Sequence, residues 1–119
     1  MEWYRLLPPS LGEAAYKSGN EMAWSKEGAL RVIALLEENG YSIDGVDVWL
    51  PTKPGPTPLI RDWDSEKIDS KALPATPAAF VCSFQLNSPE GATPGLEPVF
   101  NIWAEPMEKA SRYPLKRIP

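Results

Sequence analysis

The stretch NEMAWSKEGALRVIALLEENGYSIDGVDVWL, residues 20–50, decides the fold because a helix, a stop signal and a strand follow one another in it. Ser25 is a residue type that caps helix N-termini, and the pair Asn39-Gly40 is typical of a helix end. Between these signals, apolar residues recur at helical spacing and form one stripe, which comprises Ala29, Val32, Ile33 and Leu36. The stretch therefore predicts an amphipathic helix that begins after Ser25 and ends before Gly40.

A strand is predicted directly after this helix. Residues 46–50 alternate between apolar side chains and the pair Asp47 and Trp49, which is the period-two pattern of a half-buried strand. The face with the two valines is expected to pack on the helix, and Asp47 and Trp49 are expected to share the opposite face. Gly45 indicates a bulge or a close backbone approach, and Pro51 closes the strand.

The remaining chain consists of short apolar runs separated by proline-rich turns. Residues 51–58 hold four prolines and a glycine and are predicted to form a surface loop. Residues 79–86 and 99–104 are predicted to be strands, joined by a long loop over 87–98 into an antiparallel hairpin. One face of the first of these strands is expected to hold Phe80, Cys82, Phe84 and Leu86. The fold class that results is α+β, a two-layer arrangement of one main amphipathic helix on a small, mainly antiparallel sheet.

Length and composition favour a single soluble domain. The chain has 119 residues, 43% of them hydrophobic and 24% charged, so we expect one domain over residues 1–119. No apolar run approaches the roughly 20 residues that a membrane span needs, and the first residues do not resemble a secretory signal. Cys82 is the only cysteine, which excludes an internal disulfide; we expect it to be buried. The cytoplasm is the compartment that this cysteine usage favours.

The charge balance indicates the kind of partner. The formal net charge is −4, with the acids concentrated in the middle of the chain, between residues 37 and 69. An acidic body argues against a nucleic acid, because binding phosphates requires a basic face. It suits a basic partner protein. The alternative interpretation is that the acidic residues only keep the protein soluble.

Catalytic and metal-binding motifs are not found in the sequence. The chain has no histidine and one cysteine, which removes Ser–His and Cys–His catalysis and the usual zinc sites, and no glycine-rich phosphate loop is present. We therefore expect neither an enzyme nor a bound cofactor or metal. Two alternatives stay open. One is a small carboxylate-based enzyme or metal-binding protein that uses Asp44 with Asp47, or Asp62 with Asp64. The other is an adaptor module that uses the proline-rich loop.

The five tryptophans are the most informative residues for function. Trp3 and Trp24 are interpreted as core. Trp49, Trp63 and Trp103 each lie near an acid in the sequence, and exposed tryptophan beside charge is favoured in protein interfaces. Trp63, which lies between two aspartates, is expected to be the most exposed. The alternative is that all five are structural, since tryptophan fills small cores well.

Residues 20–49 resemble a known family. The resemblance rests on Asn20-Glu21, Ala23, Ser25-Lys26-Glu27, Ala29-Leu30, Ile33, Leu36, Gly40, Ile43 and Gly45-Val46-Asp47-Val48-Trp49. This pattern is similar to that of the immunity protein forty family, small bacterial proteins that protect a cell against its own polymorphic toxin. The resemblance implies tight binding and inhibition of a toxin domain, with Asn20, Glu21 and Asp47 at family-pattern positions. Glu21 is expected to hold the fold rather than to touch the toxin.

Charge, aromatic content and resemblance together predict an antitoxin-like immunity protein. An acidic, aromatic face would cover the active site or substrate groove of a basic cognate toxin. The residues expected on that face are Asp44, Asp47, Trp49, Asp62, Trp63 and Asp64.

Overall fold

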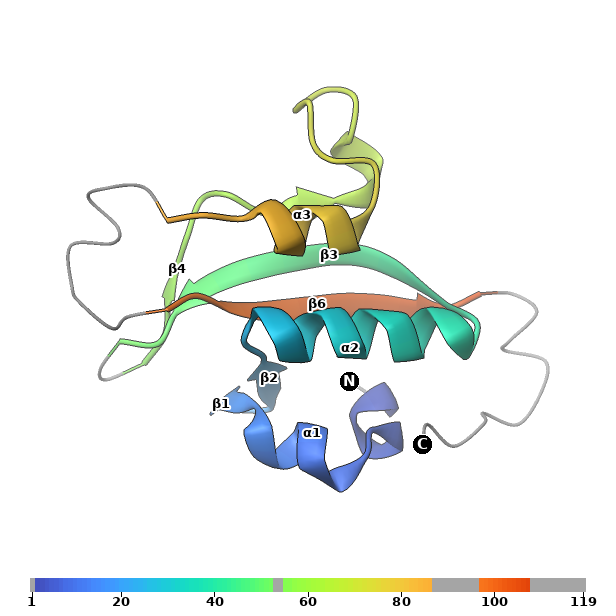
Figure 1. Cartoon of the computed structure of the whole chain (residues 1–119), viewed down its shortest axis with the longest axis vertical. Coiled ribbons are helices and arrows are strands. Elements are labelled where there is room, and N and C mark those ends of the chain that lie inside the picture. Colours follow the sequence, from blue (N-terminus) through green and yellow to red (C-terminus); the bar gives the residue numbers. More distant parts are fainter. Residues whose placement is uncertain (1, 53–54, 87–96, 108–119) are drawn as a thin grey trace.

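Helix α2 (Lys26–Glu38) and strand β3 (Tyr41–Leu50) form the centre of the fold (Figure 1). The helix lies where the sequence predicts it, and the strand includes the predicted residues 46–50 but begins five residues earlier. The computed structural model describes residues 2–52, 55–86 and 97–107. Gly40 takes a positive φ of 81° at the end of α2, the left-handed conformation that lets the chain turn directly into β3. The main layers are thus a helix and a strand that are adjacent in sequence.

The sheet is built around β3. Strand β6 (Val99–Pro106) pairs antiparallel with β3 along nearly its whole length, while β4 (Thr57–Pro58) and β5 (Trp63–Asp64) pair antiparallel with its other edge. The register with β6 shifts between Ile43 and Gly45, which confirms the predicted irregularity at Gly45. The fold is therefore α+β, with α2 packed on a mainly antiparallel sheet.

Smaller elements extend this centre on two sides. The N-terminal residues form η1 (Glu2–Leu6), α1 (Pro9–Ala14) and a hairpin of β1 (Tyr16–Ser18) with β2 (Glu21–Ala23). A bridge between Trp24 and Phe100 joins the end of this hairpin to β6. On the other side, η2 (Ser65–Lys67) follows β5, and α3 (Pro77–Ser83) lies beside α2.

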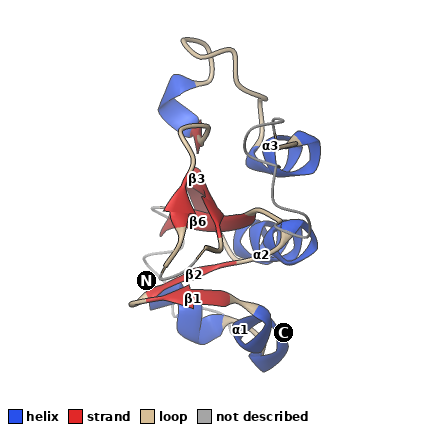
Figure 2. Cartoon of the chain, turned by 90° about the vertical axis from the view of Figure 1, so that its left-hand side faces the viewer, coloured by secondary structure: helices blue, strands red, loops and turns tan. Residues whose placement is uncertain are grey.

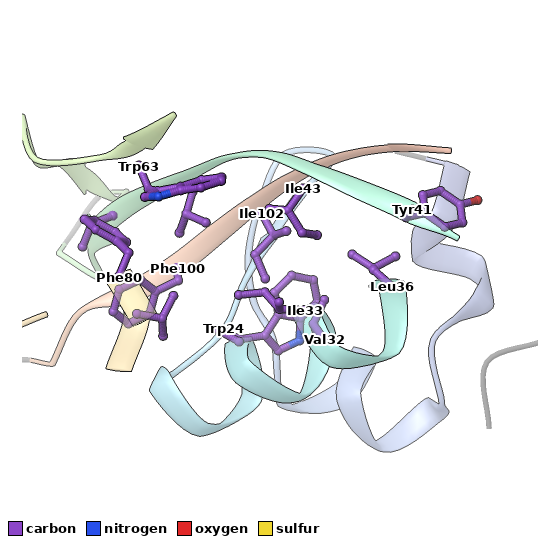
Figure 3. Packing of buried hydrophobic residues seen from close by; sticks show 14 of the residues in the cluster. Trp24, Val32, Ile33, Leu36, Tyr41, Ile43, Trp63, Phe80, Phe100 and Ile102 are labelled. Carbon is purple, nitrogen blue, oxygen red and sulfur yellow. The ribbon is translucent and has the colours of Figure 1, made fainter. Parts of the chain in front are cut away.

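The core lies between α2 and one face of the sheet (Figure 3). The predicted apolar stripe of α2 is buried, as are Val46 and Val48 on the facing side of β3. Trp3 and Trp24 stack with ring centroids 6.0 Å apart and are both buried, as predicted. The indole Nε1 of Trp24 donates to the carbonyl of Leu11 at 2.9 Å and so fixes α1 against the core.

The predicted strand over residues 79–86 is wrong. Residues 77–83 form helix α3, which buries Pro77, Phe80 and Val81 at helical rather than alternating spacing, and Phe84 is buried directly after the helix. Thr76 caps this helix and Pro77 takes its first position, two start signals that outweigh the alternation of apolar residues. Cys82 consequently faces outward and is exposed, not buried.

The predicted hairpin also fails, because its two segments do not pair. The predicted strand over 99–104 does form, as part of β6, but its partner is β3. Pairing with the long strand β3 gives β6 a partner along its full length, which the short segment over 79–86 does not offer. Most of the predicted loop over 87–98 lies outside the described residues.

The cap of α3 allows a direct test of this correction. Thr76 accepts a hydrogen bond from the backbone N–H of Ala79 at 3.1 Å. We expect Thr76→Ala to lower the free energy of unfolding by about 1 kcal/mol, the usual cost of losing an N-cap. Ser25→Ala is the matched control, because the side chain of Ser25 makes no capping bond to α2. The free energies of unfolding are measured by urea denaturation, and equal losses for the two variants would contradict the assigned cap.

Candidate acidic interaction site

The two faces of the sheet differ in what covers them. Helices α2 and α3 lie on one side of the β3–β6 ladder (Figure 2). Asp47, Trp49 and Trp103 belong to the other face; Asp47 and Trp49 are half-buried, and Trp103 is 44% exposed. The predicted sharing of one face by Asp47 and Trp49 is therefore confirmed, and this face retains access to solvent.

A cleft of about 460 Å³ lies where this face meets β5 and η2. We call it the acidic cleft, because carboxylates contribute six of the ten residues that line it and neither lysine nor arginine is among the ten. The six are Asp44, Asp47, Asp62, Asp64, Glu66 and Glu105. Three separate parts of the chain supply them: β3, residues 62–66 and β6. The cleft thus exists only because β5 and β6 pair with β3 on its two edges.

Gly45 lies between β5 and β6 on the floor of the cleft. It pairs with Asp64 of β5 on one side and with Trp103 of β6 on the other. A Cβ atom at this position would lie 3.4 Å from the carbonyl oxygen of Trp63 and 3.9 Å from the Cβ of Trp103. Both distances are ordinary van der Waals contacts, so an alanine at this position would fit between the two strands.

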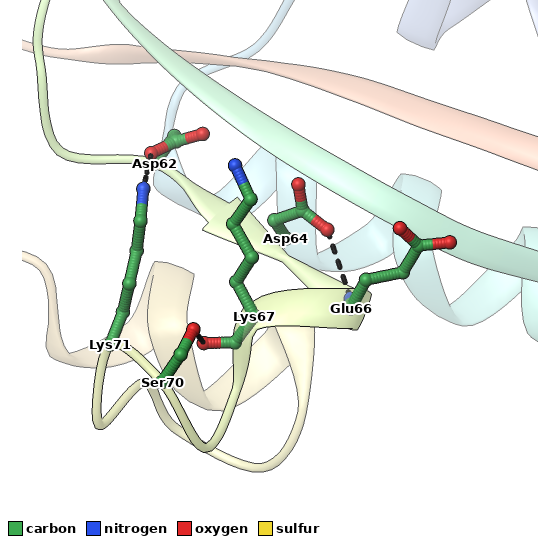
Figure 4. Close-up of polar contacts among 6 residues, drawn as sticks. All are labelled: Asp62, Asp64, Glu66, Lys67, Ser70 and Lys71. Carbon is green, nitrogen blue, oxygen red and sulfur yellow. Dashed lines mark hydrogen bonds and ion pairs between the residues drawn. The ribbon is translucent and has the colours of Figure 1, made fainter.

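Three of the six carboxylates also make contacts that hold the site together. Asp47 accepts a hydrogen bond from Nε1 of Trp103 at 2.8 Å, which fixes the orientation of that exposed ring. Asp64 accepts from the backbone N–H of Glu66 at 2.9 Å and so caps η2 (Figure 4). Asp62 lies 3.8 Å from Nζ of Lys71, an exposed ion pair on the outer rim. The acids are thus positioned by the fold.

The proton affinities of two aspartates reflect this crowding. Burial raises the pKa of Asp44 above its ordinary value, and the neighbouring carboxylates of Glu105, Glu66 and Asp64 raise it further. Burial likewise raises the pKa of Asp47; the hydrogen bond from Trp103 opposes this shift, and nearby carboxylates add to it. A negative charge in the cleft is therefore less stable than the same charge in water.

These shifts predict how stability depends on pH. Because the native pKa of Asp44 is raised, the folded protein binds this proton at a pH at which the unfolded chain, with a pKa near 3.8, has released it. The contribution of Asp44 to the free energy of unfolding is therefore most favourable below that value and is lost as pH rises through the native pKa. We expect Asp44→Asn to stabilise the protein at pH 7 by about 0.5 kcal/mol, a size that allows for screening of a partly exposed group.

The check is urea denaturation of wild type and Asp44→Asn at about pH 7 and about pH 3. The gain should largely vanish at the lower pH, where Asp44 is mostly protonated in both the folded and the unfolded state. A gain of equal size at both values would show that the carboxylate charge is not its cause.

The structure brings together five of the six residues predicted from the sequence. Asp44, Asp47, Asp62, Asp64 and Trp63 line the cleft, whereas Trp49 lies beyond it on the same sheet face and packs edge-on against Tyr16.

The predicted exposure of Trp63 is wrong. Its side chain is only 3% exposed, and its Nε1 donates to the carbonyl of Pro74 at 2.9 Å. On β5 it pairs with Val46 in a two-residue strand, and its ring turns into the core while the flanking aspartates turn outward. Trp63 is thus structural, and it is not a surface on which a partner binds.

Five lining residues were not among the six predicted for this face: Gly45, Ser65, Glu66, Trp103 and Glu105. Trp103 was noted in the sequence as a tryptophan beside an acid, but it was not placed on the face. Trp103 and Glu105 are two residues apart on one strand, so they share a face, and this spacing was visible in the sequence. Their proximity to Asp44 and Asp47 depends on the pairing of β6 with β3, which no local pattern predicts.

Of the family-pattern positions, Glu21 has a clear structural contact. Its Oε2 accepts a hydrogen bond from Nδ2 of Asn101 at 3.0 Å, and Asn101 is fully buried and also donates to the carbonyl of Met22 at 2.8 Å. Asn20 is exposed in the turn before β2. Glu21 therefore links the hairpin to β6, in agreement with the fold-holding role expected for it.

The acids of the cleft do not form a chelating group. Within residues 2–52, 55–86 and 97–107, no three histidine, cysteine, aspartate or glutamate side chains converge closely enough to hold a metal ion. The arrangement is instead a concave surface of distributed negative charge with one exposed indole beside it.

Comparisons of the chain with protein-family models, with curated proteins and with solved structures found no match. The resemblance to the immunity proteins therefore stays a prediction from the residues quoted above. Among the described residues, no helix has the length and apolar character needed to cross a membrane.

Proposed function

We propose that this chain is an immunity-type protein that acts in the cytoplasm and neutralises a basic toxin domain by binding it with the acidic cleft. The observation that carries the proposal is the gathering of six carboxylates around one concave site whose lining includes neither lysine nor arginine. Three chain segments contribute to it, so the charge is concentrated by the fold and not by one acidic run in the sequence.

Such a site favours a cationic ligand for two physical reasons. Burial and the repulsion of neighbouring carboxylates already raise the pKa values of Asp44 and Asp47, and the positive charge of an incoming lysine or arginine side chain would offset that repulsion. The field of the cleft would also steer a basic partner during encounter and raise the association rate constant. Both effects favour a partner protein whose surface carries clustered lysine and arginine side chains.

Trp103 takes the interface role that the sequence suggested for Trp63. Its ring is 44% exposed at the cleft, and the hydrogen bond to Asp47 holds it in place before any partner arrives. A pre-ordered aromatic ring loses little side-chain entropy on binding, and its face attracts the guanidinium of an arginine. We therefore infer that an arginine of the partner enters the cleft with Trp103 on one side and carboxylates on the other.

The family resemblance points in the same direction. Asp47 is a position of the family pattern, and it lies in the cleft, bonded to Trp103. Inhibition of a toxin by an acidic surface that occupies a basic active site fits both this resemblance and the negative net charge of −4.

The test is a protection experiment with the product of the gene next to this one. That product is expressed in a susceptible host alone, with this chain, and with this chain carrying Asp44→Asn, Glu66→Gln and Glu105→Gln. We expect growth arrest by the neighbour alone, relief by the wild-type chain, a stoichiometric complex on size-exclusion chromatography, and weaker protection by the substituted chain. A harmless neighbour, or protection without a complex, would contradict the proposal.

A further inference from the structure

The last twelve residues of the chain carry the opposite charge to the rest of it. Residues 108–119, which we call the basic tail, hold four of the twelve lysine and arginine residues and only one of the sixteen acids. Residues 1–107 hold the other fifteen acids against eight cations. The four cations of the tail are Lys109, Arg112, Lys116 and Arg117. The charge of the chain is thus divided between an acidic body and a short basic segment.

The basic tail follows directly on one wall of the acidic cleft. Trp103 and Glu105 of β6 line the cleft, and β6 ends one residue after Glu105. The backbone N–H of Met107 donates to the carbonyl of Gly40 at 2.9 Å, and Met107 is 49% exposed. The point from which the tail leaves the described fold is therefore fixed, lies at the surface and is two residues from a carboxylate of the cleft.

The tail is also long enough to return to the cleft. Four residues of strand, about 13 Å, separate Met107 from Trp103, and five residues lead from Met107 to Arg112, a reach of up to about 17 Å. A chain that reverses after Met107 can bring the Arg112 guanidinium to the exposed ring of Trp103, and the face of an indole attracts such a cation. A tether this short holds the tail at an effective concentration of about 1 mM or more, so even weak contacts suffice.

We propose that the basic tail of this chain occupies its own acidic cleft when no partner is bound, with Arg112 beside Trp103 and the flanking cations on carboxylates of the cleft. The argument rests on complementary charge and on the attachment of the tail beside the cleft: six carboxylates line a site without lysine or arginine, and four cations are tethered to its edge. The inference goes beyond the proposed function, because it requires no second protein. Its consequence is that a basic partner has to displace the tail, which restricts the cleft to partners that bind more strongly than the tail does.

The test places a nitroxide label in the tail of the full-length chain, with no partner present. Cys82 is the only cysteine of the chain and is exposed, so Cys82→Ser with Ser111→Cys gives a single labelling site one residue before Arg112. The probes are the amide NMR signals of Asp64 and Ser65, which line the far side of the cleft and are distant from the label in sequence. We expect these signals to lose at least about half of their intensity at about 50 mM NaCl and to recover at about 500 mM, where salt screens the contact.

Two variants of the labelled chain show whether the cleft charges hold the tail. Asp44→Asn, Glu66→Gln and Glu105→Gln together should restore the Asp64 and Ser65 signals. The same number of charges removed outside the cleft, by Glu13→Gln, Glu37→Gln and Glu38→Gln, should leave the intensity loss unchanged.

Three results would overturn the inference. Full signal intensity at low salt would show that the tail does not lie in the cleft, and an equal loss in both variants would show that the cleft charges do not hold it there. A loss that disappears on dilution would assign the contact to the tail of a second copy. Each of these results leaves the proposed function standing, because no partner is present, and a harmless neighbour in the protection experiment would likewise leave the tail contact standing.

Discussion

Replacing Trp63 with alanine is expected to lower the free energy of unfolding by about 3–5 kcal/mol, the usual cost of truncating a large buried aromatic side chain. The ring is 3% exposed and belongs to the core under β3, and its Nε1 donates to the carbonyl of Pro74 at 2.9 Å. The substitution would leave both a cavity and an unpaired carbonyl. Chemical denaturation followed by circular dichroism measures this loss.

Trp103→Ala is the matched control for that experiment. It removes the same side chain from the same sheet, but Trp103 is 44% exposed and its Nε1 bonds to Asp47 at the surface. We expect a loss of about 1 kcal/mol, mainly from the hydrogen bond to the carboxylate. Partner binding should be weakened more by Trp103→Ala than by Trp63→Ala, because only the Trp103 ring is accessible to a partner. Similar destabilisation by the two substitutions would contradict the assignment of Trp63 to the core.

Neutralising the acidic cleft is expected to have the largest effect on partner binding. The triple variant Asp44→Asn, Glu66→Gln and Glu105→Gln removes half of the six carboxylates and leaves in place the three that cap, bond or pair within the fold. We expect its association rate constant with the basic partner to fall about 10- to 100-fold at low salt. Stopped-flow fluorescence of the partner complex measures this rate.

A second triple variant controls for net charge. Glu13→Gln, Glu37→Gln and Glu38→Gln remove the same three negative charges from exposed positions on α1 and α2, outside the cleft. If the cleft concentrates the field that steers the partner, this variant should associate within about threefold of the wild-type rate. Equal slowing by both variants would mean that net charge, and not the cleft, attracts the partner.

The centre of the fold follows from local signals in the sequence. Helix α2 and strand β3 are adjacent, and their apolar periods, the Asn39-Gly40 end signal and Pro51 all lie within residues 25–51. Each of these signals acts through neighbouring residues, so the sequence alone is sufficient to predict the helix, the strand and the side of the strand that is buried.

The segment over residues 77–86 shows where local patterns conflict. Phe80, Cys82 and Phe84 alternate as in a strand, while Phe80, Val81 and Phe84 also fit one face of a helix. For a run this short, periodicity does not separate the two, and the start signal Thr76-Pro77 decides the outcome. The strand prediction gave that signal too little weight.

The acidic cleft depends on contacts distant in sequence. Asp44, Asp62 and Glu105 meet only because β5 and β6 pair with opposite edges of β3. The sequence identified most of the acids because they cluster along the chain, but it placed Trp63 outside and left Trp103, which also lies near an acid, out of the predicted face. Which of two tryptophans faces solvent is set by strand pairing, and no residue type or neighbouring charge predicts it.

The salt dependence of association tests the central claim most directly. The association rate constant of the proposed basic partner is measured for wild type, the cleft variant and the net-charge control at about 50 mM and about 500 mM NaCl, between which the Debye length falls from about 14 Å to about 4 Å. We predict a steep decrease with salt for wild type and the control, and a nearly flat response for the cleft variant. The same steep salt dependence in all three proteins would show that the partner does not approach through the acidic cleft.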